Sequence, residues 1–355
     1  MSLFSPKSVS PKISLSRWFM LASLLLLIAA GLLSVTQGPM SIPVADALRA
    51  LVPFSLHSDA PAHYQLVITG IRLPRTLLCI AVGAILAMCG AVMQGLFRNP
   101  LADPGIIGVS SGSAAGAAIA IVLLSLLDWQ LPNVVSSLAI PLFAFVGGFI
   151  TTILVYRLGT TANGTSVVMM LLAGIAIGAL SGAGIGLLSY LANDQMLRDL
   201  SLWQMGSLAG ASWNNILLAF ITLTILTVVF CRKAKALNAL LLGEAEAGHL
   251  GIDVQKLKSQ LIFFTALGVG IAVSVSGLIG FVGLVVPHLV RMLLGPNHQQ
   301  LIPFSGLLGA ALLLMADLIS RMIISPAELP VGIVTALVGA PFFIFLLLQQ
   351  RQRIA

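Results

Sequence analysis

The chain has 355 residues, of which 58% are hydrophobic and only 8% are charged, and its mean hydropathy is +1.07. A soluble domain carries about 25% charged residues, so this composition excludes a water-soluble protein of this size. The formal net charge of +7 does not indicate a nucleic-acid partner, because the basic residues separate the hydrophobic segments instead of clustering on one element. We therefore expect an integral membrane protein surrounded by lipid.

Ten apolar segments predict about ten transmembrane helices in one all-α membrane domain that covers residues 1–355. The first could instead be a cleaved signal peptide, but its apolar run is longer than the core of such a peptide. The seventh and eighth are almost continuous, and Gly277, Gly280, Gly283 and Pro287 favour interrupted helices there. The predicted segments are 17–37, 73–96, 105–127, 134–157, 166–191, 212–231, 259–277, 279–294, 303–324 and 330–349.

The basic residues predict the orientation of these helices. With the amino terminus in the cytoplasm, thirteen basic residues fall inside and five outside, so the positive-inside rule supports two cytoplasmic termini. Two loops are long: 38–72 on the periplasmic side, and 232–258 on the cytoplasmic side, where one or two short amphipathic helices are expected over 237–251. The five outside residues are Arg49, Arg72, Arg75, Arg198 and Arg321.

The fifth segment carries a glycine every fourth residue, at Gly174, Gly178, Gly182 and Gly186. This spacing places the four on one face of a helix, where another backbone can approach closely. The face could pack within the subunit, or it could form a subunit interface or a wall of the transport path.

No motif indicates a catalytic centre. None of the six lysines follows a glycine, so the chain lacks the G-x-x-x-x-G-K-[ST] loop that binds ATP. Its three cysteines, Cys79, Cys89 and Cys231, lack metal-ligand spacing and are interpreted as small buried hydrophobic residues. We expect neither an enzyme nor a bound metal or covalent cofactor, and any ATP that drives the protein is used by another polypeptide.

The loop at 94–105, with the sequence QGLFRNPLADPG, is the most informative stretch. Its prolines end the flanking helices, and by itself it is interpreted as a tight cytoplasmic turn. The whole string also resembles the signature loop of the iron-siderophore, heme and cobalamin ABC permeases, the FecCD/BtuC-like family. Matching stretches follow in order from about residue 66 to 349: RLPR at 72–75, GVSSG at 108–112, LLAG at 171–174, GEAEAGHLG at 243–251, GFVGLVVPH at 280–288 and ELPVG at 328–332.

The resemblance implies a type II ABC importer permease of the bacterial inner membrane. Such a subunit works as a homodimer with two cytoplasmic ATPases and a periplasmic substrate-binding protein. Cargo would move along the dimer axis by alternating access. ATP on the partner subunits would drive the conformational change, because it binds one conformation better than the other.

The resemblance also assigns residues. Arg72, Arg75 and Arg321 would dock acidic residues of the binding protein. The alternatives are snorkelling at the membrane interface and, for Arg321, an ion pair with Asp317 one turn earlier. The region that couples to the ATPase would comprise Leu242, Gly243, Glu244, Ala245, Glu246, Gly248 and His249.

A cytoplasmic gate near the axis would consist of Asn99 and Leu101 together with Thr165 and Ser166, and the glycine face of the fifth segment would line the path. Without the resemblance, these four polar and apolar residues are turn and cap formers. His288 and Asp317 are the ionisable groups nearest the membrane interior. A structural role is favoured for both over a proton relay, because His288 follows a proline near the inner end of its segment and Asp317 has Arg321 as a ready partner.

Heme is the expected cargo, because FRNP at 97–100 and WQMGSLAGASW at 203–213 look most like the heme permeases. Ferric siderophore and cobalamin are the alternatives. A secondary transporter that works alone would need paired intramembrane carboxylates or a charged ring, which Asp317 alone does not supply. A purely structural anchor would not need ten spans.

Overall fold

The computed structural model describes residues 12–51, 62–126, 133–161 and 164–354, and they are almost entirely helical. The long helices are α1 (Lys12–Thr36), α4 (Leu73–Leu96), α7 (Asn133–Gly159), α8 (Val167–Leu191), α10 (Trp213–Leu240), α12 (Val254–Ser276), α14 (His298–Met322) and α15 (Val331–Ile354). The shorter elements are α2 (Val44–Leu51), α3 (Ala62–Val67), α5 (Val109–Ala118), α6 (Leu124–Leu126), α9 (Asp194–Gln204), α11 (Glu244–His249), α13 (Val282–Leu294), the π-helical turns η1 (Ile68–Arg72) and η3 (Ile119–Leu123), the 3-10 turn η2 (Pro104–Ile107), and strands β1 (Thr160–Thr161) and β2 (Gly164–Thr165).

Within these residues, eight helical stretches are long and apolar enough to cross a membrane, and two shorter apolar helices, Val282–Leu294 and Val331–Phe345, accompany them. All ten overlap the predicted segments. The boundaries differ most in two places. The second span runs from His63 to Leu96, because π-helical η1 joins α3 to α4 without a break. The sixth continues to Leu240, which shortens the loop predicted at 232–258.

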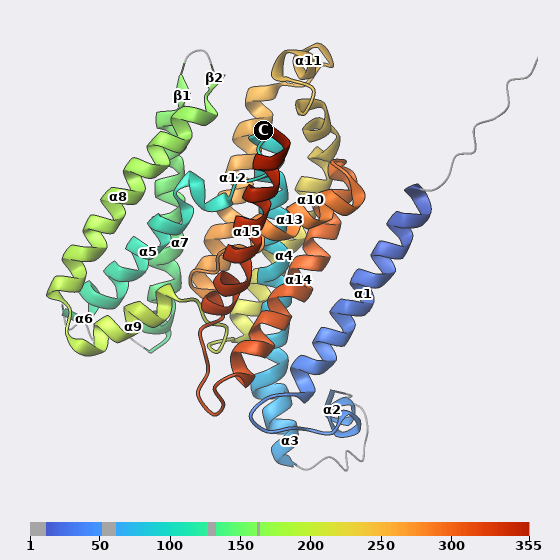
Figure 1. Ribbon diagram of the computed structural model, residues 1–355. Coiled ribbons are helices and arrows are strands. Elements are labelled where there is room, and N and C mark those ends of the chain that lie inside the picture. The colour runs from blue at the N-terminus through green and yellow to red at the C-terminus, as the bar shows by residue number, and fades with distance from the viewer. Residues whose placement is uncertain (1–11, 52–61, 127–132, 162–163, 355) are drawn as a thin grey trace, which may run out of the picture.

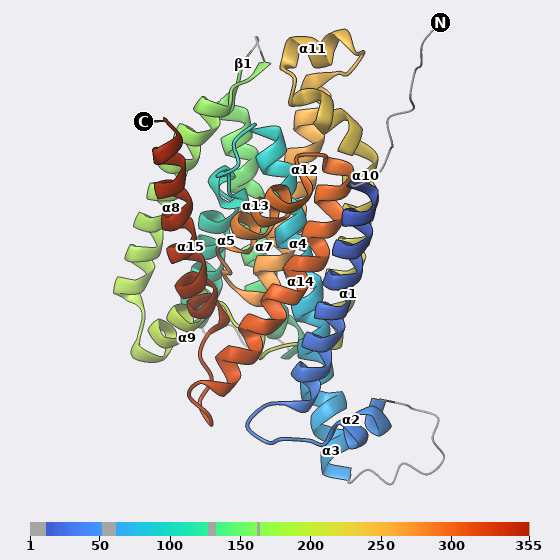
Figure 2. The ribbon, with the colours of Figure 1, turned by 45° about the vertical axis from the view of Figure 1, so that its right-hand side comes forward.

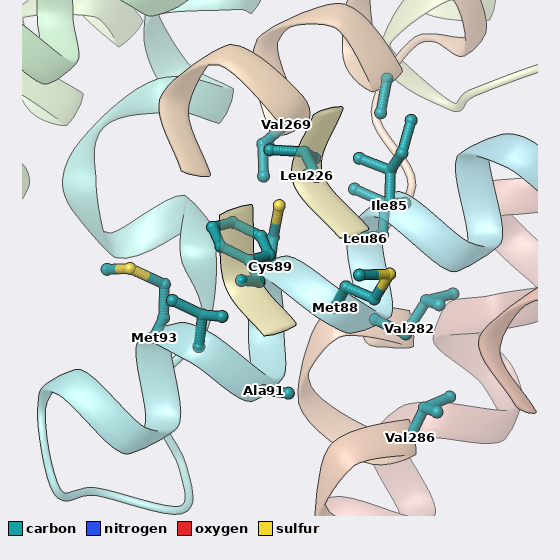
Figure 3. Close-up of a cluster of buried hydrophobic side chains, with 14 of the residues drawn as sticks. Ile85, Leu86, Met88, Cys89, Ala91, Met93, Leu226, Val269, Val282 and Val286 are labelled. Atoms are coloured by element: carbon teal, nitrogen blue, oxygen red, sulfur yellow. The ribbon is translucent and has the colours of Figure 1, made fainter. Parts of the chain in front are cut away.

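Helix α4 occupies the centre of the bundle, and 89% of its most apolar stretch is buried (Figure 1). Ile85 and Cys89 of this helix face Leu226 of α10 and Val269 of α12 in the main hydrophobic core (Figure 3). Cys79 is buried in the same way, but Cys231 is exposed on α10, so the expectation of a buried thiol is wrong there.

Close helix crossings depend on glycine at two places along α4. A Cβ added to Gly90 would overlap the backbone carbonyl of Gly283 in α13, and one added to Gly83 would overlap that of Gly309 in α14. Small residues of this kind let membrane helices approach until their backbones touch, which maximises van der Waals contact where lipid gives no hydrophobic drive. The glycines therefore determine how tightly α13 and α14 pack on the central helix.

The predicted interruption between the seventh and eighth segments is confirmed, because α12 ends at Ser276 and α13 begins at Val282. Gly277 and Phe281 both have a φ of +67°. Much of the break packs against protein: Gly277 and Ile279 are buried, and the Ser207 amide donates to the Ser276 carbonyl (2.8 Å). Irregular backbone at membrane depth is tolerated in such a setting.

The two ends of the bundle carry different elements (Figures 1 and 2). One end carries α11, the β1–β2 hairpin, the start of α1 and the end of α15, whereas α2, α3 and the connection between α14 and α15 lie at the other. We refer to the first as the α11 end and to the second as the α2 end. The start of α1 and the end of α15 thus lie at the same end of the bundle.

Candidate functional site

A cluster of buried charges lies at the α2 end. Arg75 of α4 makes ion pairs with Asp317 of α14 (2.8 Å) and with Glu328 in the connection to α15 (2.6 Å). Arg321, one turn after Asp317, pairs with the same carboxylate (3.1 Å) and donates to the Ser34 hydroxyl of α1 (2.9 Å). The Asp317 side chain is fully buried, so two guanidinium groups provide its charge compensation.

Arg72 satisfies a different set of acceptors at the same end. Its Nη1 donates to the backbone carbonyls of Val35 and Thr36, at 2.8 Å each, and its Nη2 donates to the carbonyl of Met40. The last carbonyls of a helix have no partner within the helix, and a cation near that end also interacts favourably with the helix dipole. Arg72 therefore caps the carboxyl end of α1.

These contacts correct the expectation of an outward arginine surface. Arg72, Arg75 and Arg321 are between 3% and 5% exposed, so they do not present their charges to solvent in this structure. The physical reason is that backbone carbonyls, Asp317 and Glu328 take up the donors from inside. The ion pair between Arg321 and Asp317 is the alternative that the sequence left open. The role of the three in docking a binding protein stays a prediction.

The loop after α4 is held by its own side chains. Asn99 Oδ1 accepts from the Leu101 amide (2.9 Å), and Asp103 Oδ1 accepts from the Gly105 amide (2.7 Å) at the start of η2. Arg98 adopts a positive φ of 50° to make the turn. Asn99 is exposed and Leu101 half-buried. The two are thus placed as a preformed turn, and their role in a gate stays a prediction.

Thr165 lies in the hairpin that precedes α8 and contacts α12 through its backbone. Its amide donates to Gln255 Oε1 (3.1 Å), and its carbonyl accepts from Lys258 Nζ (3.0 Å). Ser166 follows as the cap of α8. The Lys258 ammonium also pairs with Glu244 of α11 (2.8 Å), so one buried lysine joins the hairpin, α11 and α12.

The glycine face of α8 divides into two halves. A Cβ on Gly174 would overlap the carbonyl of Ile106 in η2, so this glycine packs within the subunit. Gly178 is half-buried, and a Cβ there would make ordinary contact. Gly182 and Gly186 face open space, with nothing within 4 Å of an added Cβ. The half of the face nearer the α2 end therefore lacks an internal partner in the described structure.

Helix α11 projects from the α11 end of the bundle (Figure 1). Gly243, with a φ of +133°, turns the chain into α11, and Ala247 of α11 is buried in the main core. The salt bridge between Glu244 and Lys258 fixes the helix to α12. The side of the region turned away from the bundle is exposed and includes Leu242, Ala245, Glu246, Gly248, His249 and Leu250.

The contacts that reasoning from sequence missed include Lys258 with Glu244, Arg75 with Glu328, and Asn238 with His298. The Asn238 side chain accepts from the His298 amide (2.8 Å) and meets its Nδ1 (2.9 Å), which links the end of α10 to the start of α14. No local pattern signals such long-range pairs. Among the described residues, no group of three or more His, Cys, Asp or Glu side chains is arranged to hold a metal ion.

The sequence matches the FecCD transport family over residues 26–349. It is 43% identical to the hemin transport system permease protein HmuU of Yersinia pestis over 93% of this chain and 95% of that protein. It is also 39% identical to the vitamin B12 import system permease protein BtuC of Shigella boydii, over 95% of this chain and 96% of that one.

Solved structures agree with this relationship. A metal-chelate type ABC transporter in an inward-facing conformation is similar, with a TM-score of 0.80 and 35% identity over 94% of this chain and 99% of that one. PsaBC of Streptococcus pneumoniae, at 17% identity, shares the fold with a TM-score of 0.53, over 77% of this chain and 90% of that chain. The chain thus has the type II importer permease fold, and it belongs to the FecCD transport family as a membrane permease of ABC importers.

Proposed function

We propose that the chain is the membrane subunit of a heme importer in the bacterial inner membrane. The observation that carries the heme proposal is the 43% identity to a hemin permease over nearly the whole chain. The vitamin B12 permeases are nearly as similar, at 39% for the Shigella boydii protein, so cobalamin is the second candidate cargo. Ferric siderophore is the third. Heme is treated as cargo rather than as a cofactor.

In this proposal α11 docks on a cytoplasmic ATPase. The exposed apolar side chains that flank it support the assignment, because Leu242 is 68% exposed and Leu250 is 64% exposed. The Lys258 bridge would carry the motion of the docked helix into α12 and the hairpin before α8. ATP binding to the partner would shift the permease between its two states only by favouring one of them.

The α11 end is then cytoplasmic and the α2 end periplasmic, which agrees with the excess of basic residues predicted inside. The binding protein would dock at the α2 end. In place of direct contact by the three arginines, we propose that Arg75 positions the exposed connection around Glu328, whose side chain is 36% exposed. The docking contact would then be made by this connection.

A second copy of the chain would complete the transport path. The open half of the glycine face on α8, at Gly182 and Gly186, supports this arrangement, because small residues permit close approach of a second helix or a smooth path wall. Gating by Asn99, Leu101, Thr165 and Ser166 on the cytoplasmic side is part of the same proposal.

The test is uptake into proteoliposomes that hold the permease, a candidate ATPase and, on the outside, a candidate binding protein. Heme, a ferric siderophore and cobalamin are supplied in parallel. The proposal expects ATP-dependent uptake of heme that requires all three proteins. Uptake of cobalamin in preference to heme would reassign the cargo. Uptake by this chain alone would contradict the ABC mechanism and favour a secondary transporter.

A further inference from the structure

Helices α7 and α12 form an open groove on the surface of the bundle. Its volume is about 320 Å³, which lies in the range of small-molecule binding sites. One part is apolar and the other carries polar groups. The apolar part is lined by Phe149, Ile153 and Phe263, and the polar part by Tyr156, Ser259 and Gln260.

The apolar part has a wall of aromatic rings. Phe149 meets Phe263 edge to face with ring centroids 5.7 Å apart, and Phe145 stacks on Phe149 at 5.8 Å. Phe263 remains 48% exposed. Since both helices cross the membrane, an exposed aromatic wall between them is in contact with lipid acyl chains.

The polar part contains an unpartnered group. The Oε1 atom of Gln260 is buried and has no hydrogen-bond partner within the described structure. A buried amide oxygen without a donor is costly, so each such group requires an explanation. Gln260 lines the groove, so rotation of its amide would let this oxygen accept from a ligand with a hydroxyl donor and let its N–H group donate to an ester or phosphate oxygen.

Two exposed basic residues stand beyond the polar part. Lys256 precedes Gln260 by one turn of α12, and Arg157 follows Ile153 by one turn of α7, so both lie on the groove side of their helices at the α11 end. Asp253 is the acidic residue nearby in sequence, and its carboxylate caps the helix by accepting from the Lys256 amide (3.0 Å). The two basic residues outnumber this one carboxylate, so the mouth of the groove carries a net positive charge.

We propose that the α7–α12 groove binds one anionic phospholipid of the membrane. The order of groups along the groove, from aromatic wall to amide to basic pair, follows the order of acyl chain, glycerol and phosphate in such a lipid. Basic sites between transmembrane helices favour anionic headgroups. The free acceptor on Gln260 favours a headgroup with hydroxyl donors, such as that of phosphatidylglycerol.

The first test locates the lipid. The full chain is reconstituted in phosphatidylcholine bilayers with a small fraction of phosphatidylglycerol that carries a photoreactive diazirine on one acyl chain. Crosslinked peptides are mapped by mass spectrometry. Crosslinks concentrated on 149–156 and 259–264 support the proposal. An even spread over the lipid-facing surfaces of α7, α8 and α10 overturns it, because that is the result for ordinary surrounding lipid.

The second test measures headgroup selectivity in detergent by native mass spectrometry, with dioleoyl-phosphatidylglycerol against dioleoyl-phosphatidylcholine. The double variant Arg157→Gln/Lys256→Gln should lose phosphatidylglycerol binding roughly tenfold or more. The matched control Arg232→Gln/Lys235→Gln removes the same charge from exposed positions on α10 and should retain binding. Equal losses in the two variants would overturn the proposal.

A third comparison separates lipid from cargo, since heme is also an anionic amphiphile. Gln260→Leu should weaken phosphatidylglycerol binding several-fold, and saturating hemin should leave the crosslink on 259–264 unchanged. Displacement of the lipid by hemin would reassign the groove to cargo. Because neither readout involves uptake, failure here leaves the proposed transport function standing, and failure of uptake leaves the lipid site standing.

Discussion

The two ends of the bundle differ in how deeply their charged side chains are buried. At the α2 end, Arg75, Arg321 and Asp317 are buried and satisfy one another. At the α11 end, Leu242 and Glu246 are exposed, while the buried Lys258 and the buried Ala247 hold the loop in place. Burial, rather than charge itself, thus separates side chains that hold helices together, such as Arg75 and Arg321, from side chains that are free for a partner, such as Leu242 and Glu246.

Among the substitutions that test this difference, Asp317→Ala should have the largest effect on stability. This change leaves Arg75 and Arg321 buried without their shared carboxylate, and we expect a loss of about 3–5 kcal/mol in the free energy of unfolding. Thermal unfolding of the purified protein in detergent measures it. The control is Asp46→Asn, which breaks the more exposed pair with Arg49 and should cost about 1 kcal/mol or less. Similar losses would show that the cluster at the α2 end is not the stronger one.

The central crossing is tested by Gly90→Val. The new side chain overlaps the backbone of Gly283, so α4 and α13 must separate, at an expected cost of roughly 1–3 kcal/mol. Gly182→Ala on α8 is the comparison at a position that is open within the subunit, and in the isolated subunit it should be neutral or stabilising by about 0.4–1 kcal/mol. Melting temperatures of both variants decide the point. A destabilised Gly182→Ala would place a partner on the open face.

Lys258→Met tests the ion pair that joins α11 to α12 at the α11 end. It removes the bonds to Glu244 and to the Thr165 carbonyl, so stability should fall by roughly 1–3 kcal/mol. If the bridge transmits motion, cargo-stimulated ATP hydrolysis by the assembled transporter should fall more than binding of the ATPase does. Hydrolysis and co-purification are measured on the same samples. Equal falls in both would assign the bridge to docking alone.

Leu242→Asp should have the smallest effect on the fold and a selective effect on assembly. The residue is 68% exposed, so the free energy of unfolding should change by no more than about 0.5 kcal/mol. Co-purification of the ATPase should drop clearly, because a charge enters an apolar docking contact. Val44→Asp, an exposed apolar position on α2, should leave ATPase binding intact. Unchanged binding in both would contradict the role of α11.

Apolar length was sufficient to predict the ten helices, because each lipid-crossing helix needs its own apolar run. The start of the second was misplaced, since the periplasmic loop was predicted to extend to Arg72. In the structure α3 and η1 already continue α4 on this side, so the helical stretch begins at His63. The amphipathic α9 was missed, because its eleven mixed residues resemble an ordinary loop.

The candidate site was less predictable. The exposed region around Leu242 and Glu246 was identified from its match to a known loop, and its exposure agrees with that assignment. The burial of Arg75 was not foreseen, because its carboxylate partner Asp317 lies 242 positions away. Sequence spacing describes neighbours on one helix, whereas ion pairs between helices depend on packing that no local pattern encodes.

The cap that Arg72 supplies to α1 has a consequence for biosynthesis. Helix α1 leaves the ribosome before α4 and ends in carbonyls that are closed by a side chain made 36 and 37 positions later. Until that residue is translated and positioned, the outer tip of α1 must be completed by water or lipid headgroups. Helices α1 and α4 therefore mature as a hairpin, because Arg72 at the start of α4 supplies the cap that completes α1.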